Sequence, residues 1–148
     1  MDGLNPELLP ENQCYTLDTV TIIYFLEQHP RHYQTAKEIF TKIETGKISA
    51  IISTLVFTEL LVPAYKTKEY KHAEMIVHIL SNFPNLKTIP LTTKISTTAG
   101  RLRALHGLRT PDAIHIATAL ESKSSGIITN DKGFKKIASS DFGVWLFE

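Results

Sequence analysis

The sequence predicts an α/β fold with a central, mainly parallel sheet and helices on both of its faces. Three observations lead to this prediction. Short, largely apolar runs alternate with amphipathic segments along the chain, which is typical of strand–helix units in a parallel sheet. The run Ile48–Ile52 is uncharged and contains three β-branched isoleucines, as expected for a strand that is buried on both faces. The length of 148 residues suits one domain with a sizeable core.

Five strands are expected in this sheet, each placed between two helical patterns or at the end of the chain. Because the intervening segments are long enough to cross over the sheet, neighbouring strands can run in the same direction. In chain order, the expected strands are Cys14–Leu17, Ile48–Ile52, Leu86–Ile89, Gly126–Thr129 and Val144–Phe147.

The helices are predicted from apolar spacing and from residues that favour helix ends. Gly46 and Gly107 suit the position just after a helix. Thr110-Pro111 suits a helix start, with the threonine as the cap. In order, the expected helices are Val20–Glu27, Tyr33–Thr45, a segment from Ser53 or Thr54 to near Pro63, Glu69–Ser81, Thr92–His106, a segment that begins at Thr110-Pro111, and Lys132–Ala138.

The chain is predicted to have two parts. We expect residues 1–12 to form a flexible N-terminal leader, because this terminal stretch contains Pro6 and Pro10. Residues 13–148 are expected to form a single domain. The first residues lack the basic and apolar regions of a signal peptide, and no window is apolar enough for a membrane helix. We therefore expect a soluble, cytoplasmic protein without membrane partners.

Composition excludes several classes of function. The net charge of +1 means that any nucleic-acid binding must come from local basic patches. Cys14 is the only cysteine, so an intrachain disulfide and a cysteine zinc cluster are both excluded. The absence of a glycine-rich phosphate loop argues against a nucleotide triphosphatase or a dinucleotide enzyme.

Four acidic residues stand apart from all other acidic residues in the sequence: Asp18, Glu59, Asp112 and Asp131. Charges are rarely buried unless they are paired or bind a metal. Asp18 and Asp131 follow predicted strands, and ligands of parallel sheets bind beyond the carboxyl ends of the strands. If the fold brings the four acids together, they form a divalent-cation site. Oxygen ligands favour Mg²⁺ or Mn²⁺ over zinc, and we expect Asp18 and Asp112 to be the principal ligands.

Three of these acids also have a purely structural interpretation. Asp18 can cap the helix that follows it, Asp112 lies in a first helical turn, where the helix dipole favours a carboxylate, and Asp131 lies in a turn-forming segment. Glu59 has no such explanation, because it is surrounded by apolar residues. His115, one turn after Asp112, either approaches the site or is a hydrogen-bonded partner within a packed helix.

The segments around the four acids resemble those of PIN-domain ribonucleases, in the same order. The resemblance rests on Tyr-Thr-Leu-Asp18-Thr-Val-Thr-Ile-Ile-Tyr-Phe-Leu-Glu, Thr-Leu-Val-Phe-Thr-Glu59-Leu-Leu, Leu-Arg-Thr-Pro-Asp112-Ala-Ile-His-Ile-Ala-Thr-Ala-Leu and Ile-Ile-Thr-Asn-Asp131-Lys-Gly-Phe. It covers the chain from about Cys14 onward and is greatest with VapC-type toxins of type II toxin–antitoxin modules.

The resemblance implies a three-layer α/β/α PIN-like fold over residues 13–148 and an endoribonuclease that depends on Mg²⁺ or Mn²⁺. The four acids would form its catalytic and metal-binding site, supported by Thr129 or Asn130. RNA is the implied substrate, a cognate antitoxin protein the implied partner, and we expect a homodimer. Val20 departs from the family pattern, which often has asparagine or serine there, so one possible hydrogen bond near the site is absent, while all four carboxylates are kept.

Basic residues near the acidic segments are candidates for binding RNA phosphates. They are Arg101, Arg103 and Arg109, before Asp112, and Lys132, after Asp131; Lys94, Lys135 and Lys136 belong to the same two clusters. For any one of them, a solvated helix face is an equally good interpretation.

Two other functions remain open from the sequence. One is a catalytically weak PIN-like protein that binds RNA or regulates. The other is a phosphatase that uses Asp18 as its nucleophile. Haloacid-dehalogenase enzymes need a second aspartate two residues later, where this chain has Val20.

Overall fold

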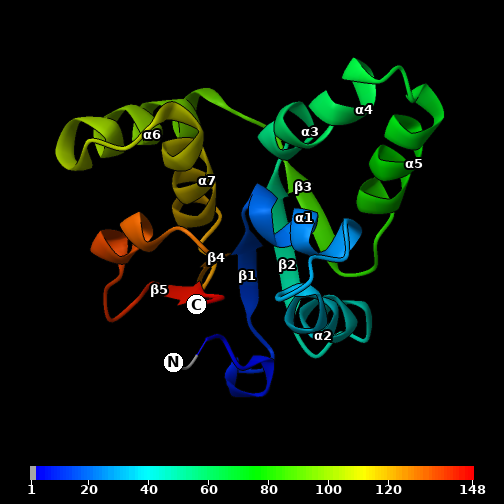
Figure 1. Cartoon of the computed structure of the whole chain (residues 1–148). Helices are drawn as coiled ribbons and strands as arrows, with labels where there is room; N and C mark the ends of the chain where they lie inside the picture. The colour runs from blue at the N-terminus through cyan, green and yellow to red at the C-terminus, as the bar shows by residue number, and fades with distance from the viewer. Residues whose placement is uncertain (1–2) are drawn as a thin grey trace.

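The computed structural model describes residues 3–148. A five-stranded sheet with the order β3-β2-β1-β4-β5 forms its centre, and every pair of neighbouring strands is parallel. The predicted α/β class is therefore confirmed. The strands are β1 (Cys14–Leu17), β2 (Ser49–Ser53), β3 (Leu86–Ile89), β4 (Gly126–Thr129) and β5 (Gly143–Leu146) (Figure 1).

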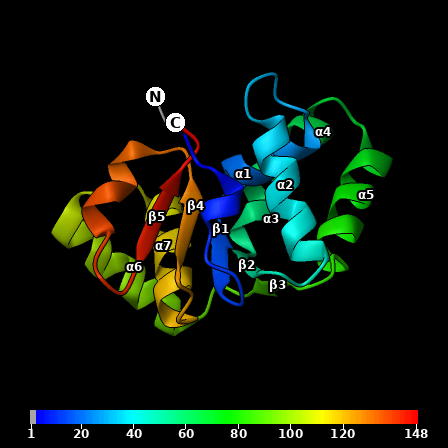
Figure 2. The ribbon, with the colours of Figure 1, turned by 90° about the horizontal axis from the view of Figure 1, so that it is seen from below.

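Helices cover both faces of the sheet and give three layers. Helices α1 to α5 pack mainly on one face, whereas α6, α7 and the 3-10 helix η2 pack on the other, and each face has its own apolar core (Figure 2). The α-helices are α1 (Thr19–Leu26), α2 (Tyr33–Glu44), α3 (Leu55–Leu60), α4 (Val62–Lys66), α5 (Tyr70–Ser81), α6 (Thr93–His106) and α7 (Thr110–Glu121), and the 3-10 helices are η1 (Pro6–Leu8) and η2 (Lys132–Ile137). None of the described helices has both the length and the apolar character that a membrane crossing requires.

The predicted helix ends are partly confirmed and partly wrong. Gly107 ends α6 in the left-handed region, with φ of 65°. Pro63 does not end a helix: α3 stops at Leu60, and Pro63 lies in the first turn of α4, where its missing N–H costs nothing. Thr110 is the first residue of α7 rather than its cap, which is Arg109. The predicted helix after Asp131 is a 3-10 helix.

The predicted leader is packed where the structure describes it. Residues 3–12 include η1, and the side chain of Leu9 is only 2% exposed. The backbone N–H of Leu4 donates to the Leu146 carbonyl of β5 at 3.0 Å, and the Tyr15 hydroxyl donates to the Pro10 carbonyl at 2.6 Å. Residues 3–12 therefore pack against the domain instead of forming a free leader. Residues 1 and 2 lie outside the described residues.

The strand register determines where the site lies. Leu17 pairs with Ile128, so the residues that follow them, Asp18 and Thr129, come side by side at the carboxyl edge. The first residues of α1, α3 and η2 leave the sheet at this same edge. Parallel strands thus bring segments that are far apart in sequence to one end of the sheet.

Candidate active site

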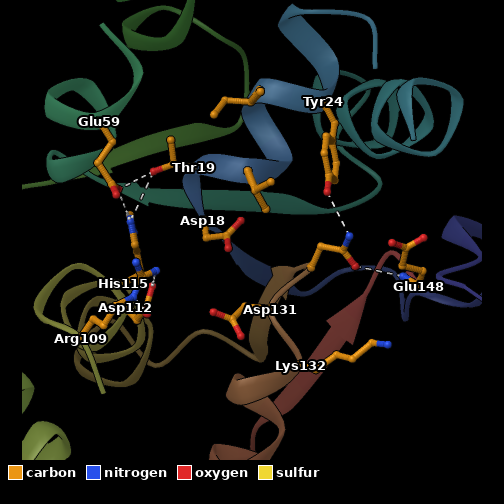
Figure 3. Close-up of a pocket in the computed structure, with 13 residues that line it drawn as sticks. Asp18, Thr19, Tyr24, Glu59, Arg109, Asp112, His115, Asp131, Lys132 and Glu148 are labelled. Carbon is orange, nitrogen blue, oxygen red and sulfur yellow. Dashed lines mark hydrogen bonds and ion pairs between the residues drawn. The ribbon is translucent and has the colours of Figure 1, made fainter. Parts of the chain in front are cut away.

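All four isolated acids line one cavity of about 640 Å³. They come from four separate places: the end of β1, helix α3, the first turn of α7 and the residue before η2 (Figure 3). Besides Asp18, Glu59, Asp112 and Asp131, the cavity is lined by Thr19, Val20, Ile23, Tyr24, Arg109, His115, Asn130, Lys132 and Glu148. The carboxyl edge of the sheet therefore carries four carboxylates around one cavity.

Asp18 is the most deeply buried of the four, with 7% of its surface exposed. One of its oxygens, Oδ1, accepts hydrogen bonds from the backbone N–H of Thr21 at 3.2 Å and from the Thr21 hydroxyl at 3.3 Å. Its other oxygen, Oδ2, accepts a short hydrogen bond of 2.5 Å from the Thr129 hydroxyl. Asp18 is thus the cap of α1, and its structural interpretation is correct, but it also faces the cavity.

Burial raises the pKa of Asp18 from 3.8 to about 6. Removing the charged carboxylate from water is the largest cause, and it outweighs the hydrogen bonds from Thr129 and Thr21 and the attraction of His115, which lower the pKa. A nearby cation stabilises such a buried carboxylate, because it compensates the negative charge that water no longer stabilises.

Thr129 connects two of the acids. Its hydroxyl donates to Asp18 and also accepts a hydrogen bond from the backbone N–H of Asp131 at 3.1 Å. Its side chain is fully buried at the end of β4. Thr129 therefore fixes the position of Asp18 relative to the turn that carries Asp131.

Glu59 is held by two neighbours from other elements. Its Oε1 accepts hydrogen bonds from the Thr19 hydroxyl and from Nε2 of His115, both at 2.7 Å. The bond from His115 is the main reason that the pKa of Glu59 lies below its ordinary value, despite partial burial. This pairing explains how an apolar segment accommodates the acid. Both sequence interpretations of His115 are correct: it lines the cavity and is a hydrogen-bonded partner.

His115 has a second unusual property. Its side chain is 3% exposed, and its Nδ1 has no hydrogen-bond partner among the described residues. Because a carboxylate can only accept, Nε2 carries the proton that bonds Glu59. A buried ring with one unsatisfied nitrogen costs free energy, and the bond to Glu59 offsets part of this cost.

Asp112 is paired with a basic residue on the same helix end. Arg109 approaches it with Nε at 3.0 Å from Oδ2 and Nη2 at 3.4 Å from Oδ1. The Arg109 side chain is largely exposed, whereas that of Asp112 is mostly covered. Arg109 can therefore leave Asp112 without disturbing the fold, either when a cation binds Asp112 or when a phosphate binds Arg109.

Asp131 and Asn130 have different tasks. Asp131 is exposed, and its Oδ1 accepts the backbone N–H of Gly133 at 2.8 Å, which caps η2. Asn130 donates from Nδ2 to the Tyr24 hydroxyl at 3.0 Å, and its Oδ1 accepts the backbone N–H of Glu148 at 3.1 Å. Asn130 thus joins α1 to the segment after β5. Tyr24 and Glu148 had no sequence signal that linked them to the site.

The predicted RNA-binding residues do not all lie at the cavity. Arg109 and Lys132 line it. Arg101 and Arg103 lie on α6 outside its lining, and Nε of Arg103 donates to the Leu108 carbonyl at 3.2 Å, so it holds the turn between α6 and α7. Helix α6 leads to the site in sequence, but these two arginines are not part of the cavity lining. Their role in binding RNA stays a prediction.

Within residues 3–148, no three acidic, histidine or cysteine side chains form a ready-made metal cluster. Asp112 is engaged by Arg109, and Glu59 is engaged by His115 and Thr19. Mg²⁺ commonly uses only one or two carboxylates together with waters and substrate phosphate. The carboxylate oxygens around the cavity fit such an ion.

Fold and site together define a class: a three-layer α/β/α domain with carboxylates gathered at the carboxyl edge of a parallel sheet. The sequence model of the PIN domain matches residues 15–140, and the chain belongs to this family. No curated protein matches the sequence significantly.

Solved structures of VapBC and VapC proteins and of a further toxin–antitoxin complex have the same fold. VapBC2 from Rickettsia felis, bound to a promoter DNA fragment, aligns with a TM-score of 0.66 and 23% identity over 89% of this chain and 98% of the other. A toxin–antitoxin complex from Klebsiella pneumoniae gives 0.63 and 24% over 87% and 95%. VapC20 from Mycobacterium tuberculosis, a toxin that cleaves the sarcin–ricin loop, gives 0.67 and 14% over 86% and 97%.

Proposed function

We propose that the protein is a metal-dependent endoribonuclease that hydrolyses RNA phosphodiester bonds. The observation that carries the proposal is the meeting of four isolated acids, from four separate segments, in one cavity. Membership of the PIN family supports it. The cofactor in this proposal is Mg²⁺ or Mn²⁺, because all four acids offer oxygen atoms.

Asp18 and Asp112 are the proposed principal metal ligands, with Glu59 and Asp131 completing the site directly or through waters. When bound, the cation supplies the positive charge that makes a water nucleophilic and stabilises the phosphate oxygens. Thr129 keeps Asp18 in place. Glu59 has its Oε1 engaged by Thr19 and His115, which holds the carboxylate in position to accept a hydrogen bond from the attacking water.

Two basic residues are placed to hold the RNA. Arg109 and Lys132 both line the cavity, one just before α7 and the other at the start of η2 (Figure 3). Their exposed side chains can bind phosphates on either side of the bond that is cut. Moving Arg109 from Asp112 to a phosphate would release both oxygens of Asp112 for the cation.

Cleavage of a labelled RNA with Mn²⁺ tests this function. We expect the wild type to cut the RNA and Asp112→Asn to lose most of this activity, since the substitution removes a proposed ligand. Asp141→Asn is the matched control, because Asp141 is exposed and lies just before β5, at the amino ends of the strands and away from the carboxyl edge that carries the site. Equal cleavage by all three proteins would refute the assignment, and no cleavage by the wild type would refute the function.

A catalytically weak RNA-binding or regulatory protein is the alternative that a specific observation favours. Both Asp112 and Glu59 are already paired, with Arg109 and His115. On this alternative the wild type binds RNA but does not cut it. A phosphatase with Asp18 as nucleophile is disfavoured, because both oxygens of Asp18 accept hydrogen bonds and its side chain is buried.

We further propose that the nuclease is the toxin of a toxin–antitoxin pair, in line with the VapBC2 structure and the toxin–antitoxin complex that share its fold. The homodimer and the cytoplasmic location stay predictions. Expression of the wild type should arrest growth of a bacterial host, and Asp112→Asn should not. A short upstream reading frame that encodes a DNA-binding protein and relieves the arrest would identify the antitoxin.

A further inference from the structure

A second cleft, of about 510 Å³, adjoins the candidate active site. It lies between the N-terminal segment and β5, the edge strand of the sheet. Lys132 and Glu148 line both the second cleft and the acidic cavity, so the two spaces meet along these residues. Figure 3 shows the Lys132 side chain extending away from Asp131, toward the side of the site where Glu148 lies.

The second cleft combines an apolar surface with positive charge. Trp145, Val144 and Leu8 line it, and Leu8 is 76% exposed. Lys132 and Lys135 lie on the same side, because residues three apart lie above one another in a 3-10 helix. Their attachment points are about 6 Å apart along the helix axis, at 2.0 Å per residue.

The indole of Trp145 forms a firm part of this surface. Its ring meets that of Tyr15 edge to face, with centroids 5.0 Å apart. It also lies directly against Gly126, where an added Cβ would come within 2.5 Å of the ring. Trp145 is nevertheless partly exposed. The indole is therefore fixed from one side and remains accessible.

We propose that the second cleft binds a nucleotide of the RNA next to the bond that is cut, with the base against Trp145 and Leu8 and the phosphates on Lys132 and Lys135. This inference rests on the proposed function, which it deepens by adding a subsite for the substrate. Stacking of a base on an aromatic ring is strong and tolerant of sequence, and lysines provide the salt-dependent attraction to the backbone.

Charge and continuity favour RNA as the occupant over a peptide. Two lysines project from one helix face, and the acid at the junction, Glu148, is already paired with Arg31 at 3.1 Å and lies 3.5 Å from His32. The strand of RNA that reaches the acidic cavity must leave it, and Lys132 spans both spaces. A single strand can thus pass from one to the other without a gap in positive charge.

The chain has only one tryptophan, so its fluorescence reports on this cleft directly. The experiment titrates the metal-free wild type, which does not cut, with a single-stranded oligoribonucleotide of about eight nucleotides, within the range of single-strand sites. Anisotropy of a dye on the RNA measures binding in parallel. We expect saturable quenching of Trp145 at the same RNA concentrations that raise the anisotropy.

Two exposed variants and one control make the test specific. Lys135→Ala should weaken binding severalfold and reduce the slope of log K against log salt by about 0.7, the value for one lost phosphate contact on a single strand. Leu8→Ala should weaken the quenching. Lys87→Ala should change neither, because Lys87 is exposed on β3, the opposite edge strand. Circular dichroism establishes that each variant is folded.

RNA binding without a change in tryptophan emission would overturn the proposal, as would equal affinities for Lys135→Ala and Lys87→Ala. Failure of the proposed function gives a different result: the Mn²⁺ cleavage assay is negative while quenching persists. In a positive cleavage assay, we expect Lys135→Ala to raise KM severalfold and to leave kcat unchanged, which a role in the chemistry would not do.

Discussion

Asp18→Asn should stabilise the metal-free protein at neutral pH. In the wild type, the buried carboxylate must carry a charge at this pH, although burial raises its pKa to about 6. The variant removes the charge and keeps the size of the side chain. The side-chain oxygen of asparagine can still accept the hydrogen bonds from Thr21, but its NH₂ group then faces the Thr129 hydroxyl. This change at Thr129 shifts the free energy of unfolding by an amount that does not depend on pH.

The magnitude follows from the two pKa values. A carboxyl whose pKa is higher in the folded than in the unfolded protein contributes its full stability at a pH below the unfolded-state pKa of 3.8. This contribution is lost as the pH rises through the folded-state pKa of about 6. The complete loss amounts to about 3 kcal/mol, at about 1.4 kcal/mol per factor of ten. Between about pH 4.5 and about pH 7.5, the free energy of unfolding of the variant should therefore rise relative to the wild type by about 2 kcal/mol.

Urea unfolding in the presence of a chelator measures this difference at the two pH values. The comparison between variants removes the effects of all other titrating groups, since both proteins share them. Asp141→Asn serves as the control and should show no such change relative to the wild type. If the stability difference between Asp18→Asn and the wild type is the same at both pH values, the carboxylate does not titrate as proposed and the reasoning from its burial fails.

Three further predictions concern the same site. His115→Leu should lower RNA cleavage roughly 10- to 100-fold, as losing a residue that orients a ligand commonly does, and His115→Gln, which keeps a donor for Glu59, should recover much of it; equal activities in the cleavage assay would contradict the positioning role. Mn²⁺ at about 100 times its Kd should add about 2.7 kcal/mol to the unfolding free energy of the wild type. It should add nothing to that of the double variant Asp18→Asn/Asp112→Asn. An equal shift in melting temperature for the wild type and the double variant would count against the site. Arg109→Gln should strengthen Mn²⁺ binding a few-fold at most, because exposed ion pairs are weak, and it should weaken RNA binding. If calorimetry shows weaker Mn²⁺ binding by this variant, Arg109 does not compete with the cation for Asp112.

The fold could be predicted from sequence because its signals are local. Apolar runs, helical spacing and Gly107 each depend on neighbouring residues only, and they give the five strands nearly to the residue. The error at Pro63 has the same origin: a proline suits both the end of one helix and the start of the next, and only the packing of α4 decides.

The site was predictable in its acids but not in their partners. Isolation in an apolar context singled out Asp18 and Glu59, because burial of a charge needs compensation wherever it occurs. The partners of Glu59, by contrast, lie 40 and 56 positions away in sequence. Arg103 shows the converse limit: it is close to Asp112 along the chain, yet it bonds the Leu108 carbonyl and does not line the cavity.

The link between Asn130 and Glu148 has a practical consequence for work with this protein. The backbone N–H of Glu148 is bonded to a residue between Thr129 and Asp131, and its side chain lines the cavity. Whatever is attached after residue 148, such as a purification tag, therefore begins in the wall of the candidate active site. The N-terminal segment runs along β5 nearby. Tags at either end are best removed before activity and affinity are measured.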